Sequence, residues 1–238
     1  MKGGRVVYDV VVFGAHPDDA EMGMGGTIAT LAKAGRSVLI VSLTQGEMGT
    51  HGSLAVRAQE AADAARVLGC DHRLLDFADT AVENTPGSRS RVMRLVRELA
   101  PTVVFAPYHT SRFGHHDGAA HVDHLATGAL VRDALKLARL RGLEPAIPAH
   151  DVRRLFFYMV PRDRYPAFTV DVSAEWETVV KALAAYATQM RIERQGNSIL
   201  SILETYRRYH GIATGCTHAE PFLCDEALRA DAETLFRI

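Results

Sequence analysis

The sequence predicts an α/β fold built on a mainly parallel sheet, with helices on both faces and a C-terminal α+β elaboration. Short β-branched runs alternate with longer amphipathic segments in the first half of the chain, as expected for strands joined by crossover helices. The second half is less regular. With 238 residues, 47% of them hydrophobic and 23% charged, the chain has the size and composition of one globular domain. We therefore expect a single, Rossmann-like domain over residues 1–238.

The elements of the first half follow from hydrophobic periodicity. Continuous apolar runs are typical of strands buried on both faces, and they predict strands at 6–14, 37–43, 73–75 and 102–106. Helical periodicity predicts helices over 21–34, 54–68, 89–99 and 122–140. Gly35 and Gly69 stand where helices commonly end, and Pro101 follows the third of these helices.

The second half carries fewer regular patterns. We expect strands at 155–160 and 168–172 and helices over 173–190 and 198–209. The charged run at 191–194 is interpreted as a solvated helix end. These elements make up the predicted α+β elaboration.

Composition excludes several classes of function. Lys and Arg number 27 against 28 Asp and Glu, a net charge of −1, so no excess of positive charge favours nucleic-acid binding. No apolar run approaches the ~20 residues of a membrane span. Three cysteines without a CxxC pair, after an N-terminus that does not resemble a secretory signal, indicate a reducing cytoplasm. Histidine stands out, because five of the 11 lie between His109 and His124.

Polar clusters follow each predicted strand of the first half. Since ligands of open parallel sheets bind beyond the carboxyl ends of the strands, we expect four loops to converge on one rim. The clusters are His16-Pro17-Asp18-Asp19, Thr44-Gln45-Gly46-Glu47, Asp76-Phe77-Ala78-Asp79 and the histidine-rich stretch after residue 106.

The cluster after the first strand predicts a metal site. Two adjacent carboxylates beside a histidine repel each other unless a cation or a helix N-terminus neutralises them. One of these aspartates could merely cap the following helix. We favour His16 and Asp19 as metal ligands, with Asp18 left unligated.

The segment His121-Val122-Asp123-His124 predicts the rest of the site. Three protein ligands and one open position are typical of catalytic zinc, although the same ligand types also hold other divalent ions. Asp123 would orient an imidazole. His109, His115 and His116 compete for the ligand role, and a merely solvated histidine-rich loop is the alternative.

Other motifs have more ordinary interpretations. Gly23-x-Gly25-Gly26 lacks the third glycine of a dinucleotide fingerprint, because position 28 is Ile28, and close helix–sheet packing explains it better. The loop Thr44–Thr50 is interpreted as a lid or a substrate-binding loop. Arg57, judged by its helix alone, is interpreted as a surface residue. Asp76 and Asp79 could contact sugar hydroxyls or cap a turn.

These residues together resemble a known family. The run Ala15-His16-Pro17-Asp18-Asp19-Ala20-Glu21, the following Gly25-Gly26-Thr27 and the downstream H-x-D-H resemble the PIG-L/LmbE family of zinc-dependent N-acetylglucosaminide de-N-acetylases over nearly the whole chain. Residues 44–50 with Arg57, and the segments 103–108, 185–189 and 218–222, resemble its bacillithiol-biosynthesis branch. The chain departs from the family's D-R-H-P-D-H turn, since it has Ser111-Arg112, an insertion at 113–120, and Val122 in place of proline.

The resemblance implies an LmbE-like deacetylase fold and a role for each matching residue. The implied metal ligands are His16, Asp19 and His124, and the implied ion is Zn²⁺, with Fe²⁺ as an alternative. Asp18 matches the general base, and His121 matches the residue that stabilises the tetrahedral intermediate, as a cation, or protonates the amine. The implied substrate contacts are Arg57, Glu47 and Arg112. A homo-oligomer is also implied.

The expected function is hydrolysis of the N-acetyl group of an N-acetylglucosamine conjugate, with N-acetylglucosaminyl malate as the first candidate. A chitooligosaccharide, an inositol conjugate or an antibiotic precursor is the second candidate. A non-catalytic metal- or sugar-binding module is a third, and a nucleotide-dependent oxidoreductase is a distant fourth. Asp18 favours an enzyme, because hydrolysis needs an unligated carboxylate beside the metal and binding does not.

Overall fold

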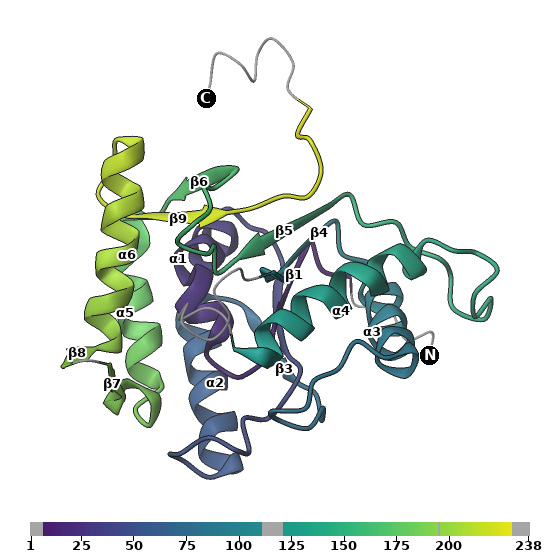
Figure 1. Cartoon of the computed structure of the whole chain (residues 1–238), viewed down its shortest axis with the longest axis horizontal. Coiled ribbons are helices and arrows are strands. Elements are labelled where there is room, and N and C mark those ends of the chain that lie inside the picture. The colour runs from purple at the N-terminus through teal and green to yellow at the C-terminus, as the bar shows by residue number, and fades with distance from the viewer. Residues whose placement is uncertain (1–6, 111–120, 195, 230–238) are drawn as a thin grey trace.

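Five parallel strands form the centre of the computed structural model, which describes residues 7–110, 121–194 and 196–229 (Figure 1). They are β1 (Val10–Gly14), β2 (Val38–Ser42), β3 (Asp71–Leu74), β4 (Val103–Pro107) and β5 (Arg154–Tyr158). Their order in the sheet is β3-β2-β1-β4-β5. The predicted α/β class and the parallel sheet are confirmed.

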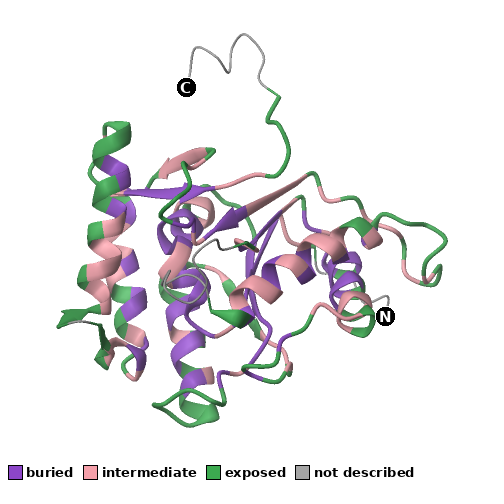
Figure 2. Cartoon of the chain, viewed as in Figure 1, coloured by how far each residue is buried: buried purple, intermediate pink, exposed green. Residues whose placement is uncertain are grey.

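Helices cover both faces of this sheet. The helices α1 (Asp19–Lys33) and α2 (Leu54–Leu68) share one core with Val10 and Val12, whereas α3 (Pro86–Leu99) and α4 (Val122–Ala138) share the other core with Val11 and Phe13. Adjacent residues of one strand therefore enter opposite cores, which is why the strands are unbroken apolar runs in the sequence. Strands β1 and β2 are correspondingly buried throughout and β4 nearly so, whereas the edge strand β3 is exposed or half-buried (Figure 2).

The C-terminal elaboration packs on the α1 and α2 side (Figure 1). It contains β6 (Phe168–Asp171), α5 (Trp176–Ala185), the short strands β7 (Glu193–Arg194) and β8 (Asn197–Ser198), α6 (Ile199–Thr214) and β9 (Ala219–Phe222). Strand β9 pairs antiparallel with β6. Among the described residues, none of the helices is long and apolar enough to cross a membrane.

Two expectations for this half were wrong. The helix expected over 173–190 is shorter, since α5 covers only Trp176–Ala185 and lies between two 3-10 turns. The chain leaves the helix at Tyr186, whose hydroxyl donates to Glu21 at 2.7 Å. The charged run at 191–194 is no helix end. It enters the exposed β7–β8 hairpin.

A buried ion pair joins the elaboration to α1. The helix is irregular at Met24 (φ −152°, ψ 28°), and the N–H groups of Gly26 and Thr27 donate to the Glu220 carboxylate at 3.0 and 2.7 Å. Arg207 lies 2.7 Å from the same carboxylate, and both side chains are 1% exposed. Glu220 thus acts as an internal cap for the second part of α1.

Glycines let α1 approach its neighbours closely. A Cβ on Gly23 would lie 2.3 Å from the Tyr158 ring, and one on Gly26 would lie 2.6 Å from Val172. These contacts are shorter than any real Cβ shows, so the predicted packing role of the glycines is confirmed.

Candidate active site

The polar loops meet where the strand order of the sheet reverses, at the carboxyl ends of β1 and β4. His16 follows β1, and His121 and His124 stand at the start of α4, which follows β4. The ring centroid of His16 lies 4.9 Å from that of His121 and 5.4 Å from that of His124. This reversal is the usual ligand crevice of an open parallel sheet.

Asp19 connects two of these histidines. Its Oδ1 lies 3.0 Å from His124 Nε2, and its Oδ2 lies 3.5 Å from His16 Nδ1. The backbone N–H groups of Ala15 and His16 each donate to Oδ2 at 2.8 Å, which fixes the carboxylate. Although burial opposes ionisation, the positive charges of His124 and His16 hold the pKa of Asp19 well below its usual value.

The donor atoms around Asp19 fit a divalent metal ion. His124 Nε2 lies 3.0 Å from Oδ1 and His16 Nδ1 lies 3.5 Å from Oδ2, so each imidazole faces its own oxygen of the carboxylate, and imidazole and carboxylate donors are the types that Zn²⁺ prefers. His16, His121 and His124 also offer nitrogens that all lie within 4.8 Å of one another. The ligand atoms of His16, Asp79 and Asp123 lie within the same limit, and Asp19 contacts both His16 and His124, so His16 belongs to every candidate set.

Burial and hydrogen bonding favour Asp19 over His121 as the third metal ligand beside His16 and His124. Asp19 is 4% exposed, whereas His121 is exposed. His121 is the N-cap residue of α4, and its Nδ1 accepts the N–H of Asp123 at 3.2 Å. Burial, with the positive charges of His16 and His124, lowers the pKa of His121. In a neutral His121 imidazole, the Asp123 contact favours the tautomer that carries its proton on Nε2.

The other nitrogen of His16 faces two carboxylates. His16 Nε2 lies 3.0 Å from Asp79 Oδ1 and 3.2 Å from Asp123 Oδ2. Burial opposes protonation, but Asp19 and Asp79 raise the pKa of His16 to about 10. The Asp123 carboxylate thus contacts the imidazole of His16, while its backbone N–H donates to His121.

Asp79 is a member of this cluster whose role the sequence left undecided. Besides His16, it contacts the loop after β2, since its Oδ2 accepts the Met48 N–H at 2.9 Å and its own N–H donates to Glu47 Oε1 at 2.7 Å. The available signal was its position at the end of a strand. Glu47, an expected substrate contact, is exposed on the same rim.

Asp18 lies beside these groups in a strained conformation. Its φ of 111° is in the left-handed region, which a non-glycine residue rarely adopts. It occupies the N-cap position of α1, yet its side chain makes no capping hydrogen bond, so the capping interpretation is wrong for Asp18. Burial, and then the negative charge of Asp19, raises the pKa of its carboxyl group, which suits a general base.

Arg57 is buried and not on the surface, so the expectation drawn from its helix alone was wrong. The residue is 4% exposed. Its guanidinium donates to Pro17 O at 2.7 Å and to Asp18 Oδ2 and Gly46 O at 3.4 Å. Arg57 therefore lies between the loops that follow β1 and β2.

Of the remaining histidine candidates, His109 is the one that lies within the described residues. His109 pairs with Asp225, 3.2 Å away, and its ring packs against Phe157. His115, His116 and the expected substrate contact Arg112 lie outside the described residues.

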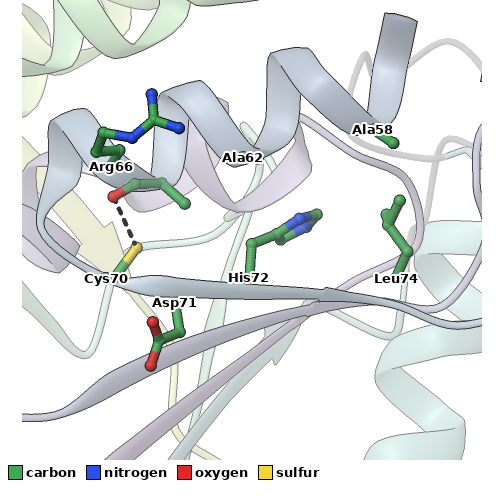
Figure 3. A pocket seen from close by; sticks show the side chains of 8 residues that line it. Ala58, Ala62, Arg66, Cys70, Asp71, His72 and Leu74 are labelled. Atoms are coloured by element: carbon green, nitrogen blue, oxygen red, sulfur yellow. Dashed lines mark hydrogen bonds between the residues drawn. The ribbon is translucent and has the colours of Figure 1, made fainter. Parts of the chain in front are cut away.

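A separate hollow of about 460 Å³ lies between α2 and the edge strand β3. Figure 3 shows Cys70, His72 and Leu74 on the side of β3 that faces α2, with Asp71 on the other side. His72 Nε2 contacts Ser42 Oγ at 2.9 Å, and burial lowers the pKa of His72 to about 4. The lining of this hollow includes none of His16, Asp19 and His124. The hollow is therefore separate from the candidate metal site at the rim.

Comparison with known proteins decides the family. The sequence model of PIG-L, described as GlcNAc-PI de-N-acetylase, matches residues 11–135, which is more than half of the chain. The chain belongs to the PIG-L family. The matched range includes the positions of His16, Asp18, Asp19 and the start of α4.

Three relatives illustrate the similarity of this PIG-L protein to others. A diacetylchitobiose deacetylase from Thermococcus kodakarensis is 28% identical, over 90% of this chain and 82% of its own. A 1D-myo-inositol 2-acetamido-2-deoxy-alpha-D-glucopyranoside deacetylase from Mycobacterium sp. (strain KMS) is 27% identical, over 77% of this chain and 75% of its own. The crystal structure of the conserved protein TT1542 from Thermus thermophilus is 35% identical and superposes with a TM-score of 0.83, over 95% and 98%.

The family assignment fixes the coarse activity and the fold. The chain is a deacetylase of the N-acetylglucosaminide type, and its sheet and helices have the family architecture. The metal, the substrate and the roles of individual residues are proposals, argued below.

Proposed function

We propose that this PIG-L protein is a zinc-dependent hydrolase that removes the acetyl group from N-acetylglucosaminyl malate, a step of bacillithiol biosynthesis. The observation that carries the hydrolytic mechanism is Asp18, a buried carboxylate next to the cluster of His16, Asp19 and His124, whose side chain makes no capping hydrogen bond to α1. A module that only binds metal or sugar has no use for such a group.

The proposed ligands are His16, Asp19 and His124. A divalent ion held there supplies a Lewis acid that polarises the acetamide carbonyl and acidifies water. Two imidazoles and a carboxylate suit Zn²⁺, and Fe²⁺ is the alternative. Asp79 and Asp123 orient His16 through its Nε2.

Two residues carry the proton and charge movements. The Asp18 carboxylate takes a proton from the attacking water and returns it to the departing nitrogen, so that acetate and a free amine are formed. General acid–base help of this kind contributes about 10²–10⁴-fold. His121, neutral and protonated on Nε2, donates a hydrogen bond to the oxygen that becomes negative. An imidazole in this tautomer is a poor proton donor, so Asp18 and not His121 protonates the amine.

The aglycone distinguishes two candidate substrates. Similarity of residues 44–50, 103–108, 185–189 and 218–222 to the bacillithiol branch supports the malate conjugate. The names of the relatives support the second candidate, a chitooligosaccharide or an inositol conjugate. Self-association and location in the cytoplasm both remain predictions. Size-exclusion chromatography with light scattering tests self-association.

The test is acetate release by zinc-loaded and by chelator-treated protein from three substrates: N-acetylglucosaminyl malate, diacetylchitobiose and the N-acetylglucosaminide of inositol. We expect zinc-dependent release, with the highest kcat/KM for the malate conjugate. Preference for either neutral substrate overturns the malate assignment and leaves the deacetylase. Release from none of the three, or release unaffected by the chelator, overturns the proposed function.

A further inference from the structure

We propose that Arg57 is a positioning residue that holds the Asp18 loop in its reactive conformation, and that it is not a contact for a substrate anion. The inference deepens the proposed function and rests on it, since it assigns how the proposed base is held. It also means that Arg57 does not determine which aglycone the enzyme prefers.

The hydrogen bonds of the guanidinium are directed at the protein. Nη2 donates to the carbonyl of Pro17 at 2.7 Å and approaches Asp18 Oδ2 at 3.4 Å, while Nη1 approaches the carbonyl of Gly46 at 3.4 Å. One side chain thus joins the loop after β1 to the loop after β2. The Pro17 contact lies immediately before Asp18 in the chain.

The glycines of the loop after β2 are packed around this guanidinium. A Cβ on Gly46 would lie 2.6 Å from Arg57 Nη1, and one on Gly49 would lie 2.7 Å from the same atom. Gly46 also has a φ of +69°. The glycine-rich sequence of the loop is therefore explained by the arginine that it encloses.

Enclosure leaves little room for a substrate. Arg57 is 4% exposed, and its Nε is buried without a hydrogen-bond partner in the described part of the chain. A guanidinium placed to bind an aglycone would present its donors to the crevice. The Arg57 guanidinium directs Nη1 and Nη2 at two loops and leaves Nε without a hydrogen-bond partner among the described residues.

Asp18 needs such support for two reasons. Its left-handed backbone costs of order 1–3 kcal/mol and persists only where the surroundings enforce it. Asp18 also immediately precedes Asp19 in the chain, and the like charges of the two carboxylates repel each other. The Arg57 guanidinium supplies a bond to the preceding carbonyl and a positive charge opposite Asp18.

The decisive experiment separates kcat from KM in zinc-loaded Arg57→Met. We expect kcat to fall about 10²-fold, as displacement of a catalytic group by about 1 Å can cause, equally for N-acetylglucosaminyl malate and diacetylchitobiose, with KM within about twofold. Arg57→Lys should recover part of kcat. A KM increase confined to the anionic malate substrate, with kcat retained, overturns the inference.

Two control variants, Arg66→Met and Gly87→Ala, and a second disturbing variant, Gly49→Ala, accompany this experiment. Arg66→Met lies on the same helix, with a side chain 71% exposed, and should leave kcat and KM unchanged. Gly49→Ala pushes on the guanidinium without altering Arg57 and should lower kcat, whereas Gly87→Ala, whose Cβ would meet only Thr85 Oγ1 at 3.9 Å, should not. Normal kcat in Gly49→Ala contradicts the inference even if Arg57→Met fails to fold.

A structural measurement keeps the inference separate from the proposed function. In a crystal structure of Gly49→Ala or Arg57→Met, we expect Asp18 to leave the left-handed conformation seen at φ 111°. An unchanged Asp18 overturns the positioning role. This result is readable even if the wild-type protein releases no acetate, the outcome that defeats the proposed function alone.

Discussion

The rim of the sheet and the C-terminal elaboration both bury charged side chains, but they compensate them differently. In the elaboration, Glu220 receives two backbone N–H groups, the Thr27 hydroxyl and the Arg207 guanidinium, all at 2.7–3.0 Å. At the rim, Asp18 precedes Asp19 directly and meets Arg57 only at 3.4 Å. Fully compensated charges serve the fold, whereas crowded, incompletely compensated ones mark the place of the chemistry.

The comparison separates two kinds of substitution. Changes at the rim should remove activity or metal binding and leave the free energy of unfolding nearly unchanged. Changes in the elaboration should lower the free energy of unfolding and leave the activity of each folded molecule.

The largest expected effect belongs to Asp18→Asn. We expect kcat to fall about 10²–10⁴-fold, because the amide cannot accept the proton of water. Zinc affinity should remain, since Asp18 is not a proposed ligand, and urea unfolding of the metal-free protein should show equal or greater stability. Loss of zinc binding would make Asp18 a ligand and contradict its assigned role.

The opposite pattern is expected for Arg207→Met. Removing one partner of a buried ion pair costs about 3–5 kcal/mol, and urea unfolding measures this loss directly. The neighbouring Arg208→Met, whose side chain is 62% exposed, should change stability by less than about 0.5 kcal/mol. Activity per folded molecule should equal that of the wild type in both variants, and a selective fall in kcat for Arg207→Met would erase the division between the two regions.

A smaller effect is expected for Asp79→Asn at the rim. Loss of a carboxylate that orients a metal-binding histidine typically costs about 10–100-fold in metal affinity. Competition with a chromogenic chelator measures this affinity. Asp76→Asn is the matched control, because Asp76 lies in the same loop but pairs with Arg91. Equal zinc affinities in the two variants would show that the Asp79 contact does not support His16.

The smallest effect concerns acid stability at the hollow. The pKa of His72 is about 4 in the fold and about 6.5 in an unfolded chain. Between pH 6.5 and 4 the unfolded state therefore binds the proton that the folded state excludes, and stability falls as the pH falls. His72→Gln should lose less stability than the wild type between pH 7 and 5, with parallel urea curves above pH 7. Identical losses between pH 7 and 5 would contradict the burial of a neutral His72.

Most of the central sheet could be predicted from the sequence, because strands buried on both faces are continuous apolar runs. The helix at 54–68 was predicted to the residue, since its periodic pattern begins at Leu54 and Gly69 follows its last residue. Strand β9 was not predicted, because Ala219–Phe222 contains a glutamate and a proline. Its conformation depends on pairing with β6 and on the burial of Glu220 against Arg207, which no local pattern reveals.

The site divides in the same way. His16, Asp19, Asp123 and His124 come together because the carboxyl ends of parallel strands meet, a consequence of topology that the sequence pattern shows. The contact of Asp79 with His16 depends on the path of the loop after β3. The burial of Arg57 depends on the glycine loop that encloses its guanidinium. Both are long-range contacts between loops, beyond the reach of periodicity.

The central claim is that His16, Asp19 and His124 hold the metal and that Asp18 stays unligated beside it. A crystal structure of the zinc-loaded protein, phased at the zinc absorption edge, tests this most directly. We expect one ion bound by two imidazoles and the Asp19 carboxylate at about 2.0–2.2 Å, with no Asp18 oxygen in the coordination shell. An ion bound by His121 in place of Asp19, or by Asp18 itself, would contradict the claim.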